Sequence, residues 1–483
     1  MAGRQISFLH STALWAAVIA GAVFGRIIEK EPEILNRDPS LNLEQANDYN
    51  REFYRTSSLV GLSQLEQLNE NPYFFAGSVK TNSRSDRRVS NVASGFSNQP
   101  TSHVTNETAK EYVKKYISDS FQYTSGLHTT IQRFEPLQFM NIYDNSQVPL
   151  GANIIGVIQG KEWGTPNDKP LVVGAHWDTV NFTPGTDDNG SGVAAMLETA
   201  RAIAHSACKP KYTIIFVAFD LEEVGSQGSL IFIKEYLMKV LKLNFPKEVG
   251  MAAFQGAFIM DTIMDFNDTE YSQTFPTDWS LVVPDVYDEV ANEKYKGDFL
   301  SMIYRRDVDN RLAEKFHFHW GKSNHDQKFK LKPIPLMLTA DLPELEILAD
   351  HLNFLRSDHA RFWYMNDSAV PHTLNAVLMT DTGPYRGNMR NCYHTVCDGP
   401  EVSLNANPDN IKFLEKITQA LTDTIVDMSE CDLGESNNTR EPYSSNVYLS
   451  TGSVNVKNSS PRGIGSPLKY LMNFVKWMQP KNP

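Results

Sequence analysis

Short apolar runs alternate with amphipathic segments through the middle of the chain. Five short runs are mainly aliphatic or β-branched, as strands buried on both faces of a sheet tend to be. They are ANIIGVIQG from Ala152, PLVVGAH from Pro170, YTIIFVAFD from Tyr212, FQGAFIMD from Phe254 and LNAVLMTD from Leu374. Residues 191–206 and the segment NPDNIKFLEKITQALTDTIV from Asn407 carry apolar stripes at helical spacing. This alternation predicts an α/β fold, a three-layer sandwich with helices on both faces of a mixed, mostly parallel central β-sheet.

The rest of the chain divides by composition. Residues 26–104 are polar and rich in Ser, Asn and Arg, which is typical of a surface loop or flexible linker. The main body extends over residues 105–430 and contains a less regular insertion, residues 266–333. Residues 431–483 form a Ser/Asn-rich tail that ends in an amphipathic segment, SPLKYLMNFVKWMQ, which either docks on the body or contacts a membrane surface.

Residues 1–25 resemble an export signal. Arg4 precedes an apolar run from Ala13 to Gly25, which is shorter than the ~20 residues of a membrane span. The sequence Ala20-Gly21-Ala22 has the small-x-small pattern of a cleavage site. We therefore expect a signal peptide and a secreted or endomembrane-lumen protein, with an uncleaved membrane anchor as the alternative.

The cysteines and glycosylation motifs fit an exported chain. Four cysteines, Cys208, Cys392, Cys397 and Cys431, follow no zinc-finger spacing. An even number allows two disulfides in any of three pairings, and Cys392 and Cys397 are close enough in sequence to pair locally. Asn-x-Ser/Thr motifs begin at Asn106, Asn267, Asn366, Asn437 and Asn458 and would be usable in a secreted glycoprotein.

The charge balance narrows the function. The formal net charge of the 483 residues is -12, which argues against nucleic acid as a partner because phosphate binding needs a basic face. An acidic chain fits a protein that gathers carboxylates around cations.

Potential metal ligands follow the predicted strands. His176 and Asp178 come at the end of PLVVGAH, Glu222 and Glu223 follow YTIIFVAFD, and Asp261 ends FQGAFIMD. Two further segments are PGTDDNGSG, which contains Asp187 and opens the helix at 191, and NCYHTVCD, which contains His394. Each has an ordinary alternative, since DDNGSG can be a turn with a helix N-cap and adjacent glutamates are usually solvated. Together they fall at the carboxyl ends of strands, where a parallel sheet gathers ligands into one cleft.

The ligand chemistry indicates zinc. Two histidines and three carboxylates without cysteine suit mixed nitrogen and oxygen ligation. One carboxylate can bridge two ions ~3.5–4 Å apart, and a glutamate beside a ligand glutamate can accept a proton from water.

The motifs GAHWDTV, PGTDDNGSG, FVAFDLEEVGSQGS, FIMD, SDHARFW and NCYHTVCD resemble, in this order, those of the co-catalytic di-zinc aminopeptidases of metallopeptidase family 28. The resemblance covers roughly residues 105–430 and includes glutamate carboxypeptidase and glutaminyl cyclase as wider relatives. It implies a phosphorylase/hydrolase-like zinc exopeptidase fold and two Zn²⁺ cofactors. The motif YHTVCDG departs from the family's usual YHTxxDT.

The resemblance also implies a role for each motif residue. His176 and Asp261 would hold one zinc, Glu223 and His394 the other, and Asp187 would bridge them. Glu222 would be the general base, and Asp178 would orient His176 through its second ring nitrogen. His359, in SDHARFW, would contact the substrate or the developing oxyanion. Arg361 would favour acidic substrates if it pointed into the cleft, or it would face solvent.

The implied function is hydrolysis of N-terminal residues from peptides, with Glu222 moving the proton from water to the leaving amine. Two alternatives remain. One is a glutaminyl-peptide cyclotransferase on the same fold, and the other is a receptor-like binding protein that has lost catalysis. Peptides are the expected partners. Membrane contact is expected only through an uncleaved N-terminal segment, and the pattern predicts no oligomeric state.

Overall fold

The computed structural model describes residues 102–136, 150–180, 183–244, 254–323, 327–364, 373–399, 402 and 407–432. The expected signal segment at 1–25, almost all of the polar extension, and the tail beyond residue 432 with its amphipathic segment lie outside the described residues. Within the described ranges, no helix is both long and apolar enough to cross a membrane.

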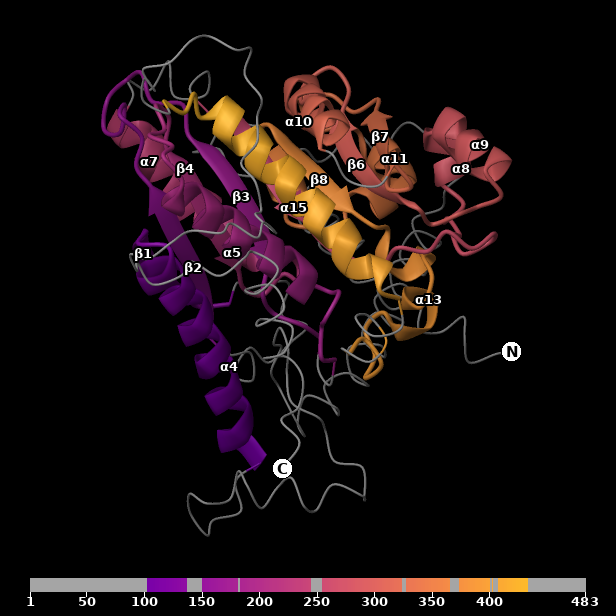
Figure 1. Ribbon diagram of the computed structural model, residues 1–483, viewed down its shortest axis with the longest axis horizontal. Coiled ribbons are helices and arrows are strands. Elements are labelled where there is room, and N and C mark those ends of the chain that lie inside the picture. The colour runs from indigo at the N-terminus through magenta and orange to yellow at the C-terminus, as the bar shows by residue number, and fades with distance from the viewer. Residues whose placement is uncertain are drawn as a thin grey trace, which may run out of the picture.

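An eight-stranded mixed sheet forms the centre of the body, with strand order β1-β2-β4-β3-β5-β8-β6-β7 (Figure 1). The strands are β1 His128–Phe134, β2 Gly151–Ile158, β3 Leu171–His176, β4 Ile214–Phe219, β5 Gly256–Met260, β6 Phe299–Arg305, β7 Lys330–Leu336 and β8 Ala376–Thr380. Strands β4, β3, β5 and β8 are mutually parallel neighbours. The antiparallel pairs are β1 with β2, β2 with β4, and β6 with β8.

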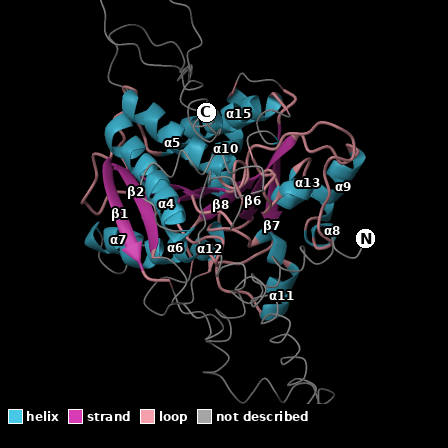
Figure 2. Cartoon of the chain, turned by 90° about the horizontal axis from the view of Figure 1, so that it is seen from below, coloured by secondary structure: helices cyan, strands magenta, loops and turns pink. Residues whose placement is uncertain are grey.

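Helices cover both faces of this sheet, as the sequence predicts (Figure 2). One layer contains α4 Ser102–Asp119, α5 Gly190–His205, α10 Asn310–Lys322 and α15 Asp409–Met428. The other contains α6 Gln227–Ile231, η3 Phe232–Leu237, α7 Met238–Asn244, α8 Trp279–Val282, α9 Pro284–Asn292, α11 Leu345–Asp350, η4 Leu352–Phe354 and α12 His359–Trp363. Near the carboxyl ends of the strands lie η5 Gly383–Tyr385 and α13 Met389–Cys392, and η1 Ser120–Thr124 extends α4.

Alternation along each buried strand separates two hydrophobic cores. In β3, Leu171, Val173 and Ala175 pack in the core under α5 and α15, whereas Val172 packs in the core on the opposite face. Because both faces are covered, these strands are apolar at nearly every position, and this explains why short apolar runs identified them. The three-layer α/β sandwich is confirmed.

The expectation of a less regular insertion at residues 266–333 is wrong. This segment supplies β6, α10 and the start of β7, and β6 and β7 form one side of the central sheet. Only its first part, through α8 and α9, consists of turns and short helices.

Two disulfides use all four cysteines. Cys208 pairs with Cys431, joining the segments that follow α5 and α15, and Cys392 pairs with Cys397 beside His394. The sequence left three pairings open, and the structure selects the local one.

Candidate metal centre

The side chains of the candidate site come from the carboxyl ends of the parallel strands. His176 is the last residue of β3, the turn 220–223 follows β4, and Asp261 follows β5 directly. The loop that leads into α5 adds Asp188, and the loop after α13 adds His394. Parallel strands deliver these residues to one edge of the sheet.

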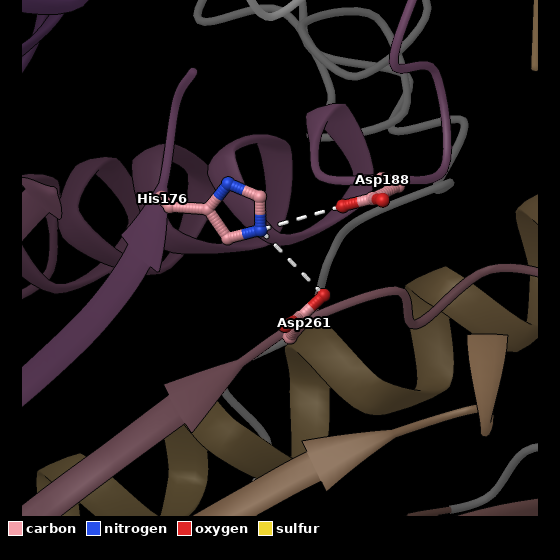
Figure 3. Close-up of side chains that lie close together, drawn as sticks. All are labelled: His176, Asp188 and Asp261. Atoms are coloured by element: carbon pink, nitrogen blue, oxygen red, sulfur yellow. Dashed lines mark ion pairs between the residues drawn. The ribbon is translucent and has the colours of Figure 1, made fainter. Parts of the chain in front are cut away.

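One group of potential ligands consists of His176, Asp188 and Asp261 (Figure 3). The His176 Nε2 atom lies 3.4 Å from Asp188 Oδ1 and 3.6 Å from Asp261 Oδ1. Nδ1 of the same ring donates to the backbone carbonyl of Asp178 at 3.0 Å. This hydrogen bond fixes the tautomer, so that the Nε2 lone pair points toward the two carboxylates.

A second group consists of Asp188, Glu223 and His394. His394 Nε2 lies 3.1 Å from Asp188 Oδ2 and 3.2 Å from Glu223 Oε2. The two groups therefore share Asp188, which presents one oxygen to each histidine. The side chains of His394 and Asp261 are 25% and 15% exposed, whereas His176 and Asp188 are 1% and 2% exposed, so solvent reaches the site from the side of His394 and Asp261.

The residue between the two histidines is Asp188 and not Asp187. The Asp187 carboxylate points away from both groups, and its Oδ1 accepts a hydrogen bond from the Met264 amide at 3.0 Å. Asp187 and Asp188 lie in the turn that precedes α5, and of the two only Asp188 contacts the histidines. The expected bridging position is thus corrected by one residue.

Asp178 contacts both the glutamate turn and the second ring nitrogen of His176. Its carboxylate accepts hydrogen bonds from the backbone amides of Glu222 at 3.1 Å and Glu223 at 3.2 Å. Its backbone carbonyl accepts a hydrogen bond from His176 Nδ1 at 3.0 Å, and its carboxylate Oδ1 lies 3.6 Å from the same ring nitrogen. Asp178 therefore holds the glutamate turn and the histidine ring in one arrangement.

Two residues that sequence analysis did not single out hold Asp188 in place. The Asp398 carboxylate accepts hydrogen bonds from the amides of Asp187 at 2.9 Å and Asp188 at 3.0 Å. Asn189, the N-cap of α5, accepts from the amides of Gly192 and Thr262 and donates to the Met260 carbonyl. The Asp-Asn-Gly-Ser motif was recognisable as a cap, but its contact with the end of β5 was not.

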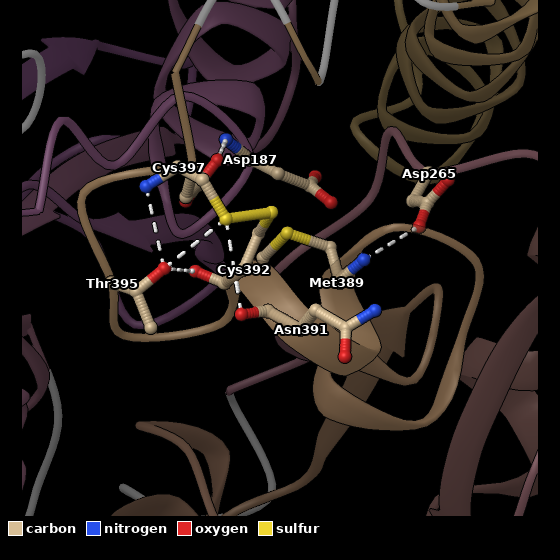
Figure 4. The surroundings of a disulfide bond; sticks show 8 residues. Asp187, Asp265, Met389, Asn391, Cys392, Thr395 and Cys397 are labelled. Atoms are coloured by element: carbon tan, nitrogen blue, oxygen red, sulfur yellow. Dashed lines mark hydrogen bonds between the residues drawn. A yellow bond between two sulfur atoms is a disulfide. The ribbon is translucent and has the colours of Figure 1, made fainter.

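The loop that carries His394 is closed by the disulfide between Cys392 and Cys397 (Figure 4). Thr395 Oγ1 donates to the Cys392 carbonyl at 2.9 Å, and the Tyr393 ring stacks on His394 with centroids 3.8 Å apart. His394 itself has a left-handed backbone, with φ of 57°. Leu221 (φ 58°) and Thr262 (φ 48°), which adjoin Glu222 and Asp261, are also left-handed, and such strain is typical of functional sites.

Burial and crowding perturb the pKa values of these groups. Burial opposes protonation of His394, but Glu223 and Asp188 outweigh it and raise the pKa of His394 to about 10. The pKa of His176 is also raised, because hydrogen bonds with Asp178, Asp188 and Asp261 overcome the effect of burial. Burial raises the pKa of the Glu222 carboxyl well above its usual value. The cluster thus has an excess of carboxylates that only protons or cations can balance.

The SDHARFW segment is placed differently from the expectation. His359 is fully buried, its Nε2 donates to the Phe354 carbonyl at 2.9 Å, and its ring packs against Trp363, so it does not face the substrate side. Asp358 is the residue of this motif whose charge acts on His176 and Asp261. Arg361 is also buried and donates to the Gly225 carbonyl at 2.7 Å, so it points neither into the cleft nor to solvent.

Comparison with known proteins confirms the resemblance that the motifs indicated. Residues 153–283 match the model of Peptidase family M28. This segment includes His176, Asp188, Glu222, Glu223 and Asp261, whereas His394 lies beyond it.

Individual relatives match over short stretches. Aminopeptidase YwaD of Bacillus subtilis (strain 168) is 40% identical over 90 residues, which are 19% of this chain and 19% of that protein. A glutamate carboxypeptidase 2 homolog of Caenorhabditis elegans is 32% identical over 121 residues, 24% of this chain and 15% of that protein. The matched part thus spans about a fifth of these relatives or less. The solved structure of BSAP, a zinc aminopeptidase from Bacillus subtilis, matches with a TM-score of 0.36 at 19% identity over 58% of this chain and 50% of that chain.

Proposed function

We propose that the protein is a zinc-dependent exopeptidase, an aminopeptidase that removes N-terminal residues from peptides and holds two Zn²⁺ ions. The observation that carries this proposal is the pair of ligand groups that share Asp188, with Glu222 beside them. The match to Peptidase family M28 and the name of the Bacillus subtilis relative support the reaction class.

The residues present fit zinc. His176 and Asp261 would hold one ion, Glu223 and His394 the other, and Asp188 would bridge both. Three buried atoms in this set, Asp188 Oδ2, Glu223 Oε1 and His394 Nε2, make no hydrogen bond among the described residues, although such atoms normally find a partner. Imidazole nitrogens and carboxylate oxygens without thiolate are the donors of catalytic zinc sites, which suits these orphaned atoms.

Zinc at such a site lowers the pKa of a water molecule and polarises the carbonyl of the bond to be cleaved. Glu222 would act as the base that takes the proton from this water and returns it to the leaving amine. Ser226 Oγ donates to Glu222 Oε1 at 3.3 Å, and the backbone amide of Glu222 is held by Asp178. The raised pKa of the buried Glu222 carboxyl suits a group that must both accept and release a proton.

Export from the cytoplasm is part of the same proposal. Two disulfides use all four cysteines of the chain, and structural disulfides persist in oxidising compartments. The signal-like residues 1–25 and the glycosylation motifs agree with a secreted or lumenal location.

The first test measures zinc per chain on purified protein together with hydrolysis of a panel of aminoacyl-nitroanilides. We expect about two zinc ions and chelator-sensitive release of nitroaniline. Conversion of an N-terminal glutaminyl peptide to pyroglutamate with one zinc would instead identify a cyclotransferase. Absence of both activities after zinc is added would identify a binding protein.

The second test replaces Glu222 with Gln. The variant should lose about 10²–10⁴-fold in kcat, the usual contribution of a general base, and keep the zinc content of the wild type. Glu235→Gln, at an exposed position of η3, serves as the matched control and should leave kcat unchanged. Full activity of Glu222→Gln would show that another group is the base.

A further inference from the structure

A pocket adjoins the proposed metal centre. Asp261 forms part of its wall, and Trp279, Asn353, Arg356, Tyr385 and Tyr393 are among the other lining residues. The pocket and the proposed zinc site therefore share Asp261, and a group bound in the pocket lies next to the ligand cluster.

The charges in this pocket are few. Arg356 is the single cation and Asp261 the single carboxylate among its described lining residues. If Asp261 holds zinc, as proposed above, its charge is matched by the ion, and the guanidinium dominates the rest of the pocket. Asn353 Nδ2 donates a hydrogen bond at 2.9 Å to Oδ2 of a second acid, Asp278, which is not among the lining residues.

Aromatic neighbours hold the Arg356 guanidinium in place. Its Nη2 donates to the Tyr393 hydroxyl at 3.2 Å, and its central carbon lies 5.6 Å from the centroid of the Tyr393 ring. Tyr393 in turn stacks on His394, so one tyrosine connects the cation of the pocket with a proposed zinc ligand. A planar guanidinium that is oriented in this way is suited to carboxylate recognition, because little side-chain freedom remains to be lost on binding.

The remaining wall suits a short side chain. Trp279, Ile303 and Leu378 line the pocket and are themselves buried, so part of the pocket wall is apolar. A methylene stem would contact these residues while a terminal charged group meets the arginine.

We propose that Arg356 binds the side-chain carboxylate of the substrate's N-terminal residue, so that the pocket selects glutamate or aspartate at that position. This inference rests on the proposed aminopeptidase function and adds a substrate class to it. Arg356, rather than Arg361, is then the residue that favours acidic substrates.

The test compares kcat/KM for glutamyl- and glutaminyl-nitroanilide, which differ by one charge at nearly the same shape. The wild type should prefer the glutamyl substrate by about ten- to hundred-fold, the range for a charge-assisted hydrogen bond. Arg356→Met should bring the ratio close to one, and Arg356→Lys, which keeps the charge, should retain part of the preference. Arg306→Met, at a half-exposed arginine next to β6, is the matched control and should keep the wild-type ratio.

A binding measurement separates this inference from the proposed function. Free L-glutamate should raise the Tm of the purified protein more than L-glutamine does, and Arg356→Met should remove that difference. Hydrolysis without a glutamyl preference, or a preference that survives in Arg356→Met, would overturn the role of Arg356 and leave the aminopeptidase intact. Glutamate-selective binding without hydrolysis of any substrate would support Arg356 and overturn the aminopeptidase. Failure of both measurements would overturn both.

Discussion

At the scale of single residues, one position in a loop separates a proposed metal ligand from a structural acid. The sequence shows two adjacent aspartates, and nothing in its periodicity indicates which of them faces the histidines, because the loop before α5 has no repeating geometry. In the structure Asp188 faces them, and the Met264 amide binds Asp187. His176, Glu223, Asp261 and His394 were predictable because they follow buried strands or a distinctive motif.

The pair Asp188→Asn and Asp187→Asn tests this assignment. Asp188→Asn should lower the zinc content below that of the wild type and abolish nitroanilide hydrolysis, because the amide cannot bridge two cations as a carboxylate does. Asp187→Asn should retain zinc, since burial and the neighbouring Asp381 already raise the pKa of Asp187 and favour its neutral form. Metal analysis after gel filtration measures the zinc content of both variants. Loss of zinc in Asp187→Asn but not in Asp188→Asn would restore Asp187 as the bridge.

His359 provides a pH-dependent prediction away from the ligands. Burial lowers the pKa of His359 to about 3, below the ordinary value of 6.5. As the pH falls below 6.5 the unfolded chain takes up this proton first, so the contribution of His359 to the free energy of unfolding declines by about 1.4 kcal/mol per pH unit until the pH reaches about 3. Between pH 7 and pH 5 this amounts to a loss of about 2 kcal/mol.

Urea unfolding of wild type and His359→Gln, both in chelator, measures this contribution. The variant lacks the titrating group, so its stability relative to wild type should improve by about 2 kcal/mol between pH 7 and pH 5. His317→Gln, on the exposed side of α10, should show no such change. Parallel pH profiles for wild type and His359→Gln would contradict the buried, neutral histidine.

At the scale of elements, the sequence predicted the strands that are buried on both faces. It did not predict the strands in which polar and apolar residues are mixed. β2, β3, β4, β5 and β8 are apolar at nearly every position, whereas every residue of β1 except Phe134 is exposed or half-buried. β7 contains Pro333 and Pro335, which argue against a strand unless it lies at an edge, and β7 pairs only with β6 among the described strands. Whether β7 lies at an edge depends on the order of all strands in the sheet, and the local sequence of β7 does not reveal that order.

The loop between Cys392 and Cys397 makes an element-scale prediction. The disulfide brackets His394, whose backbone is left-handed, so it restricts the conformations in which His394 can leave the cluster. Replacing both cysteines with Ser should weaken zinc binding by about ten- to hundred-fold, as loss of other supporting contacts does. Competition with a chromophoric chelator measures the affinity, and an unchanged value would show that Tyr393 and Thr395 hold the loop without the disulfide.

At the scale of the whole molecule, the second disulfide acts on stability and not on the site. Cys208 and Cys431 are 223 residues apart in sequence, so their bond closes a very long loop of the unfolded chain. Replacing both with Ser should lower the free energy of unfolding by about 3–5 kcal/mol and leave zinc affinity unchanged. Thermal unfolding of the Cys208/Cys431 and Cys392/Cys397 double variants compares the two disulfides. A larger loss of Tm in the Cys392/Cys397 variant would contradict the prediction.

The position of β8 has a consequence for the order in which the molecule can be built. β8 lies between β5 and β6, although β6 and β7 precede it in sequence. On a ribosome the first five strands and the β6–β7 pair therefore emerge as two separate sheets, and they join only when residues 376–380 are released. His394 follows 14 positions after the end of β8. The complete set of proposed zinc ligands is therefore present only after β8 has been synthesised and has joined the two parts of the sheet. Metal capture at this site then belongs to the last stage of synthesis of the body.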